Sequence, residues 1–76
     1  MSATPSLLPP RTRAKIWRLL GVYQKVYVQE LIGIYGTKAN SYRRMATQVD
    51  VPYVLAQAEH FESVLLELYR IMDSLE

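Results

Sequence analysis

Hydrophobic side chains in the last third of the chain recur at the spacing of an α-helix. Eight of them, from Val51 to Leu75, are separated by alternating steps of three and four residues, which places all eight on one helical face. We therefore predict a helix over residues 51–75 that packs against other helices. Other apolar residues broaden this face beyond one narrow seam, which favours a bundle over a two-stranded coiled coil.

A second long helix is predicted over residues 11–35. Basic and polar residues recur every three or four positions on one side, and apolar residues fill the opposite side and its flanks. A strand is the competing interpretation for residues 25–28, where polar and apolar residues alternate, but Gln29 and Glu30 interrupt that alternation. Gly36 is expected to end the helix in a left-handed conformation.

The segment between the two long helices carries polar and helix-breaking residues. Residues 36–40 are predicted to form a polar loop, after which Asn40 or Ser41 caps a short helix over residues 41–49. Asp50 is expected as the N-cap of the last helix, with Pro52 in its first turn, where proline is tolerated. The predicted fold is all-α, with three helices in the order long, short, long, and the long pair antiparallel.

The domain organisation follows from the length and composition. Residues 1–10 are predicted to form a flexible N-terminal arm and residues 11–76 a single helical domain. A 76-residue chain buries only about 60–65% of its unfolded surface when it folds alone, and no cysteine is present to add a disulfide or a thiolate metal site. These features exclude a multidomain enzyme, a disulfide-stabilised miniprotein, a zinc finger and an iron–sulfur carrier.

The two long helices carry more apolar surface than one small chain can cover. We therefore predict a homodimer, or an obligate partner protein, with a four-helix bundle as the simplest assembly. The predicted seam consists of Ile16, Leu20, Tyr23, Tyr27, Leu31, Val54, Ala58, Phe61, Leu65, Leu68 and Met72.

Charge is divided unevenly along the chain. Residues 1–48 contain eight basic residues and one acid, whereas residues 49–76 contain one basic residue and six acids. This division favours a bundle in which basic and acidic helices are neighbours. It also allows an anion-binding or nucleic-acid-binding surface. The candidate contacts for such a ligand are Arg11, Arg13, Lys15, Arg18, Lys38, Arg43 and Arg44.

A helix-turn-helix motif is the alternative functional interpretation. It would place Ala46 in the first helix, the turn at Asp50 and a reading helix over residues 52–61. That reading helix has no Lys or Arg and would present Glu59 to the phosphates, which counts against DNA binding.

No catalytic, metal or cofactor site is predicted. His60 is the only histidine, and a helical chain of this length rarely encloses a pocket for a small-molecule substrate. No targeting signal is recognised, so a cytoplasmic location is expected. No membrane partner is predicted either, because the helix behind the basic ridge is too apolar to lie in an interface. The sequence thus predicts a small non-catalytic adaptor or regulatory protein that works as an oligomer. A nucleic-acid-binding regulator that uses its basic half is the alternative.

Overall fold

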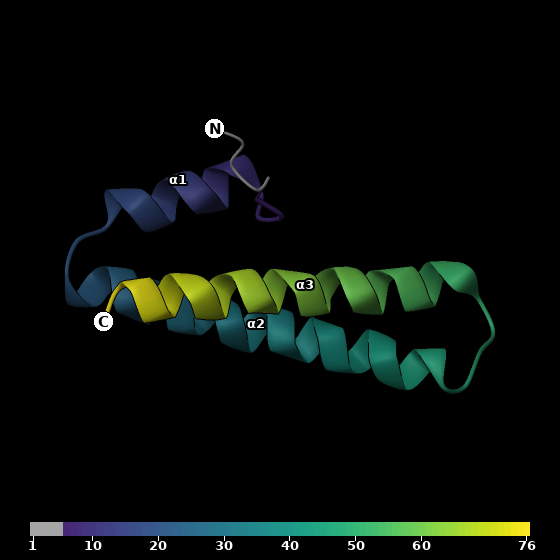
Figure 1. Cartoon of the computed structure of the whole chain (residues 1–76). Helices are drawn as coiled ribbons and strands as arrows, with labels where there is room; N and C mark the ends of the chain where they lie inside the picture. Colours follow the sequence, from purple (N-terminus) through teal and green to yellow (C-terminus); the bar gives the residue numbers. More distant parts are fainter. Residues whose placement is uncertain (1–5) are drawn as a thin grey trace.

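A computed structural model of the chain describes residues 6–76, which contain three α-helices and no strand. Helix α1 spans Pro10–Arg18, α2 spans Val22–Ala46 and α3 spans Pro52–Ser74. Helices α2 and α3 run antiparallel side by side, and α1 lies over the end of this hairpin where α2 begins and α3 ends (Figure 1). The prediction of an all-α fold with three helices is confirmed, but the order of lengths is short, long, long.

The first break in helical structure lies at residues 19–21, inside the predicted helix 11–35. Leu19 is extended, and Gly21 has φ 59° and ψ −133°, a conformation that side chains with a Cβ rarely adopt. The Gln24 side-chain amide donates a hydrogen bond of 2.9 Å to the carbonyl of Ile16, which satisfies one of the free carbonyls at the end of α1. The prediction of one continuous helix was wrong because Gly21, not Gly36, adopts the positive φ.

Helix α2 then continues through residues 36–40, which were predicted to form a loop, and includes most of the predicted short helix 41–49. Gly36 lies half-buried against α3, and a Cβ at this position would meet Leu65 Cδ2 at an ordinary 4.0 Å. Packing of a helix face against a neighbour outweighs a local preference for a turn, which explains why the helix persists.

Helix α3 begins within one residue of its predicted start. Pro52 occupies its first turn as predicted, but Val51 rather than Asp50 holds the N-cap position. The start is therefore set by the fixed φ of proline and the extended residue before it.

The hydrophobic core is concentrated at the end of the hairpin that α1 covers. Its fully or nearly fully buried members are Leu8, Ile16, Val28, Leu31, Val64 and Leu68. The other half of the hairpin buries smaller side chains, namely Ala39, Val54 and Ala58.

The segment before α1 is attached to α3. Residues 1–5 of the predicted flexible arm lie outside the described residues. In the rest of it, the Ser6 hydroxyl and the Leu7 amide both donate hydrogen bonds to the Glu67 carboxylate, the second at 2.7 Å. Leu8 is buried among the core residues. This attachment holds α1 on one face of the hairpin.

Candidate association surface

The α3 half of the predicted seam faces α2 of the same chain. Val54, Ala58 and Leu68 are buried, and Phe61, Leu65 and Met72 are half-buried. The 3–4 repeat therefore forms the interior of the hairpin, and a surface for another chain has to lie elsewhere.

The N-terminal half of the predicted seam is split by the break at Gly21. Ile16 and Leu31 are buried and Tyr27 is half-buried, whereas Leu20 and Tyr23 are exposed. The apolar pattern that predicted one continuous helical face thus belongs to two separate helices, whose buried sides contain different members of it.

An exposed apolar stripe runs along α3 beside the buried seam. Leu66 and Tyr69 are 58% and 52% exposed, and Leu55 lies on the same side of the helix. Glu62 and Asp73 complete this stripe, because residues 55, 62, 66, 69 and 73 are separated by 7, 4, 3 and 4 positions. The sequence contains this second repeat, but the stronger seam next to it makes it look like a mere flank.

A matching stripe on α2 lies on the same side of the hairpin. It contains Lys25, Ile32, Gly36 and Arg43, at steps of seven, four and seven residues. The guanidinium of Arg43 joins it to the α3 stripe, donating hydrogen bonds of 2.9 Å from Nε and 2.5 Å from Nη2 to the two carboxylate oxygens of Glu62. We call the surface formed by the two stripes the Arg43–Glu62 face.

The face opposite to this one is the face that α1 covers. Glu67, which binds Ser6 and Leu7, lies five residues beyond Glu62 and hence about 140° around α3. Lys15 of α1 likewise reaches Tyr27, with Nζ 4.7 Å from the ring centre. Helix α1 therefore leaves the Arg43–Glu62 face uncovered within the described chain.

The electrostatics of this face follow the charges of the two helices. Hydrogen bonding to Arg43, and the attraction of its positive charge, lower the pKa of the Glu62 carboxyl, while the same bond raises the pKa of Arg43. Helix α2 has four basic residues and one acid, and α3 has four acids and one basic residue. On the Arg43–Glu62 face itself, α2 contributes the basic residues Lys25 and Arg43 and α3 contributes the acidic residues Glu62 and Asp73. The α2 edge is therefore basic and the α3 edge is acidic, with apolar side chains interspersed along both.

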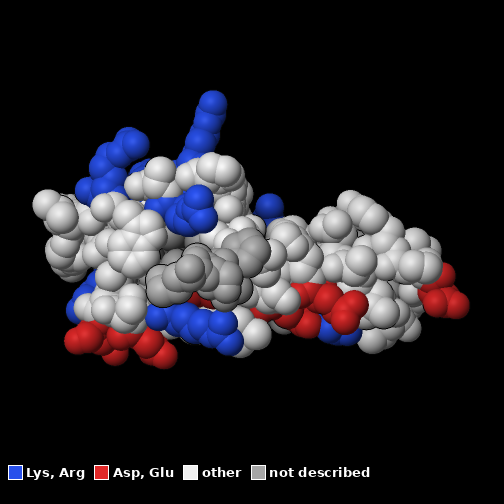
Figure 2. Space-filling view, turned by 45° about the horizontal axis from the view of Figure 1, so that its top comes forward, with Lys and Arg blue, Asp and Glu red and all other residues white. Residues whose placement is uncertain are grey.

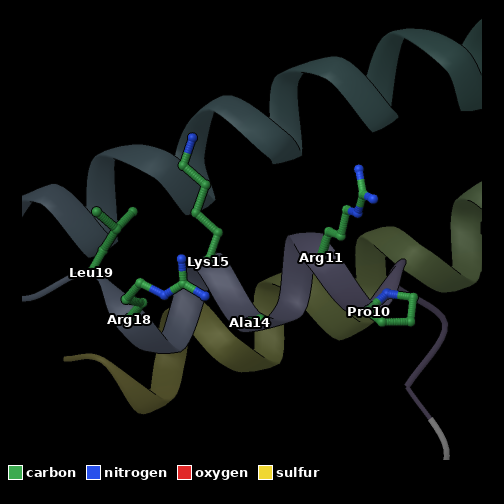
Figure 3. A pocket seen from close by; sticks show the side chains of 6 residues that line it. All are labelled: Pro10, Arg11, Ala14, Lys15, Arg18 and Leu19. Atoms are coloured by element: carbon green, nitrogen blue, oxygen red, sulfur yellow. The ribbon is translucent and has the colours of Figure 1, made fainter.

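The predicted anion contacts fall into two groups. Arg11, Arg13, Lys15 and Arg18 belong to α1, and most of the basic side chains in Figure 2 gather over that end of the molecule. A surface hollow of about 560 Å³ is lined there by Pro10, Arg11, Ala14, Lys15, Arg18 and Leu19, with Lys15 extending toward α2 (Figure 3). The other three cations lie on the second half of α2.

This second group is partly engaged with neighbouring side chains. The Lys38 ammonium lies 5.6 Å from the centre of the Phe61 ring, and Arg43 is paired with Glu62, while Arg44 is exposed. The cations of α1 and those on the second half of α2 therefore form two separate basic groups.

The region of the alternative helix-turn-helix motif forms a helical hairpin. Helices α2 and α3 lie antiparallel on either side of Asp50, whereas the two helices of a helix-turn-helix cross at about 90–120° (Figure 1). Ala58 within the predicted reading helix is fully buried against the hairpin, so one side of this helix is already used for packing.

His60 and the neighbouring aromatic residues form packing contacts. The His60 ring meets the Phe61 ring edge-on, with the ring centres 5.3 Å apart. The Tyr42 ring of α2 stacks on the Phe61 ring, with the ring centres 5.5 Å apart. Among residues 6–76, no three His, Asp or Glu side chains are placed to hold one metal ion. Within the same residues, no helix is long and apolar enough to cross a bilayer.

Comparison with protein-family models, curated proteins and solved structures found no match to this chain. The functional conclusion therefore depends on the surfaces described above.

Proposed function

We propose that this chain is a non-catalytic association module whose working form is a homodimer, built by packing two hairpins through their Arg43–Glu62 faces. The observation that carries the proposal is the uncovered apolar stripe of Leu55, Leu66 and Tyr69. Apolar side chains aligned along a helix and bordered by charges are typical of a surface that packs on another helix. In the dimer, two helices from each copy complete a four-helix bundle.

Charge complementarity selects one of the two possible two-fold arrangements. A two-fold axis parallel to the helices places α2 of each copy over α3 of the other, so that a basic edge meets an acidic edge. An axis across the helices would instead place α2 over α2 and bring like charges together. We therefore infer the parallel axis.

The parallel axis also gives a definite register. Rotation about this axis keeps each residue at its height along the bundle, and the register within the hairpin is set by Arg43 with Glu62 and by Gly36 with Leu65. Gly36, which has no side chain, then lies level with Leu66 of the second copy. By the same register, Lys25 lies level with the end of α3, near Asp73 and Glu76.

Sedimentation equilibrium over a range of concentrations tests the proposal. We expect a dimer for the native chain and, for Leu66→Asp, a dissociation constant raised roughly a hundredfold or more, because the carboxylate would have to be buried. Leu20→Asp is the matched control: Leu20 is also an exposed leucine, but it lies on the linker between α1 and α2, so dimerisation should not change. A folded monomer at all concentrations would contradict the proposal.

A charge reversal tests the arrangement separately. Lys25→Glu should weaken the dimer several-fold, and adding Asp73→Lys should restore it. If Lys25→Glu strengthened the dimer instead, α2 would have to face α2, and the parallel axis would be wrong.

Nucleic-acid binding through the basic half remains the alternative function. A gel-shift assay at two salt concentrations distinguishes it, because phosphate contacts give binding that weakens steeply as salt rises.

A further inference from the structure

The three most exposed large apolar side chains of the described chain lie at the connection between α1 and α2 or directly beside it, and Trp17 lies near them. Leu20, Tyr23, Val22 and Trp17 are 79%, 72%, 65% and 54% exposed. They point outward because α1 ends at Arg18, the chain turns at Gly21, and α2 restarts at Val22. We call these four residues the α1–α2 corner.

The side chains of the corner protrude from the molecule. Exposures above one half mean that their surroundings cover little of them, and the corner lies at one end of the hairpin (Figure 1). Such a protruding apolar tip suits a deformable partner into which its side chains can insert. A groove would instead suit a partner that inserts into the protein.

Basic charge predominates at this end of the molecule. Five basic residues lie on α1 or the first turn of α2, namely Arg11, Arg13, Lys15, Arg18 and Lys25, whereas the end of α3 and the residues after it, at the same end of the hairpin, carry two acids, Asp73 and Glu76. In Figure 2, basic side chains stand out from the end of the molecule where α1 lies, and a smaller group of acidic side chains lies at the lower edge of the same end. The partner that fits this charge is a negatively charged surface.

We propose that the α1–α2 corner docks the protein onto the surface of an anionic lipid bilayer. Trp and Tyr side chains favour the headgroup level of a membrane, aliphatic side chains reach the acyl boundary, and Lys and Arg stay with the lipid phosphates. A nucleic acid would use the cations and the aromatic faces, but it offers no site for Leu20 and Val22. The lipid surface therefore accounts for all four corner residues.

The break in the helix is what makes this proposal physically reasonable. The sequence predicted no membrane partner because one continuous apolar helix seemed to lie behind the basic ridge. In the structure, Ile16 is buried in the core while Trp17 and Leu20 face outward. The apolar residues of the core and those of the corner are thus separate sets.

The corner and the Arg43–Glu62 face are different surfaces, so docking does not require the proposed dimer. If that dimer forms with its axis parallel to the helices, both corners lie at the same end of the bundle and engage one membrane together, which raises the apparent affinity. The monomeric variant Leu66→Asp should then bind the same vesicles more weakly but not lose binding. Failure of docking and failure of dimerisation are therefore separable.

The only tryptophan of the chain lies in the corner, so its intrinsic fluorescence reports on docking directly. The full chain is titrated with vesicles of phosphatidylcholine alone and with vesicles in which about a third of the lipid is phosphatidylserine. We expect a blue shift of Trp17 emission and co-sedimentation with the anionic vesicles only. Raising the salt to about 0.5 M should remove most of the binding, because the charges are then screened.

Substitutions at the two ends of the molecule provide the matched comparison. Tyr23→Ser and Leu20→Ser should each lower the partition coefficient roughly tenfold, because each withdraws from the membrane interface apolar surface equivalent to about one to two methylene groups. Tyr53→Ser is the control, because Tyr53 is a similarly exposed tyrosine in the first turn of α3, at the opposite end of the hairpin. Circular dichroism confirms that each variant is folded.

Three results would overturn the proposal. The first is the absence of a blue shift and of co-sedimentation with anionic vesicles. The second is an equal loss of vesicle binding in Tyr53→Ser. The third is that a single-stranded oligonucleotide shifts Trp17 emission, depends on Tyr23 and displaces the protein from vesicles, which would assign the corner to nucleic acid.

Discussion

Alanine substitutions at the three glycines test the two helix boundaries on which the fold depends. Gly21 lies in the turn between α1 and α2 with φ 59°, whereas Gly33 and Gly36 both lie inside α2. A Cβ at Gly33 meets no atom of the described chain within 4 Å, and a Cβ at Gly36 meets only Leu65 Cδ2, at 4.0 Å. Both helical sites therefore have room for alanine, and Gly21 has an unsuitable backbone.

The expected effects have opposite signs. Alanine inside a helix is favoured over glycine by about 1 kcal/mol, so Gly33→Ala and Gly36→Ala should each raise the free energy of unfolding by about that amount. Gly21→Ala should lower it by about 1–3 kcal/mol, because a residue with a Cβ is strained at this φ and ψ. For a domain of this size, 1 kcal/mol corresponds to a shift of about 4–8 °C in Tm.

Urea denaturation followed by circular dichroism, at one low protein concentration for all variants, measures these differences. Gly33→Ala is the control, because its Cβ touches nothing and reports the helix propensity alone. If Gly36→Ala destabilised the protein as much as Gly21→Ala, Gly36 would have to adopt a left-handed conformation. The continuous α2 helix would then be refuted.

Three further predictions concern the core, the N-terminal segment and the ion pair. Leu68→Ala should cost about 2–5 kcal/mol of unfolding free energy, since Leu68 is fully buried, and a loss below about 0.5 kcal/mol in urea denaturation would contradict its place in the core. Glu67→Gln should cost about 1–2 kcal/mol by removing the charged acceptor for Ser6 and Leu7, whereas Glu59→Gln, on the exposed side of α3, should be nearly neutral. The pKa of Glu62 is lowered in the folded chain, so its pairing with Arg43 stabilises the fold above the ordinary carboxyl pKa of 4.5 and ceases to do so as the pH falls through the folded-state pKa. Denaturation of the native chain and of Glu62→Gln between neutral and acidic pH should show this difference shrinking, and a difference that grew on acidification would contradict it.

The sequence predicts the helical class and the α3 helix well, because both depend on a periodicity that is repeated many times. Val54, Ala58 and Leu68 are buried as their spacing requires, and Pro52 marks the start of α3. The boundaries in the first half depend on single residues. Gly21 and Gly36 have the same local freedom to form a turn, but Gly36 lies in the part of the chain that packs along α3, and this packing favours the helical conformation there.

The surfaces were harder to predict than the helices. The sequence shows which residues are apolar, but two apolar stripes on one helix become inner and outer only when a neighbour covers one of them. Leu65 and Leu66 are adjacent in the chain, yet one packs toward Gly36 and the other is mostly exposed. The exposure of Leu20 and Tyr23 depends on the break at Gly21, which a continuous-helix interpretation hides.

The uneven distribution of core volume along the hairpin has a consequence for local opening. The largest fully buried side chains are Ile16, Leu68, Val28 and Val64, all in the part that α1 covers, whereas the half near the turn buries two alanines and one valine. Amide hydrogens near residues 40–58 should therefore exchange with solvent through local fraying, and those around Val28 and Leu68 only when the whole chain unfolds. The hairpin would then loosen from its turn, with the Arg43–Glu62 bridge marking the limit of the first segment to open.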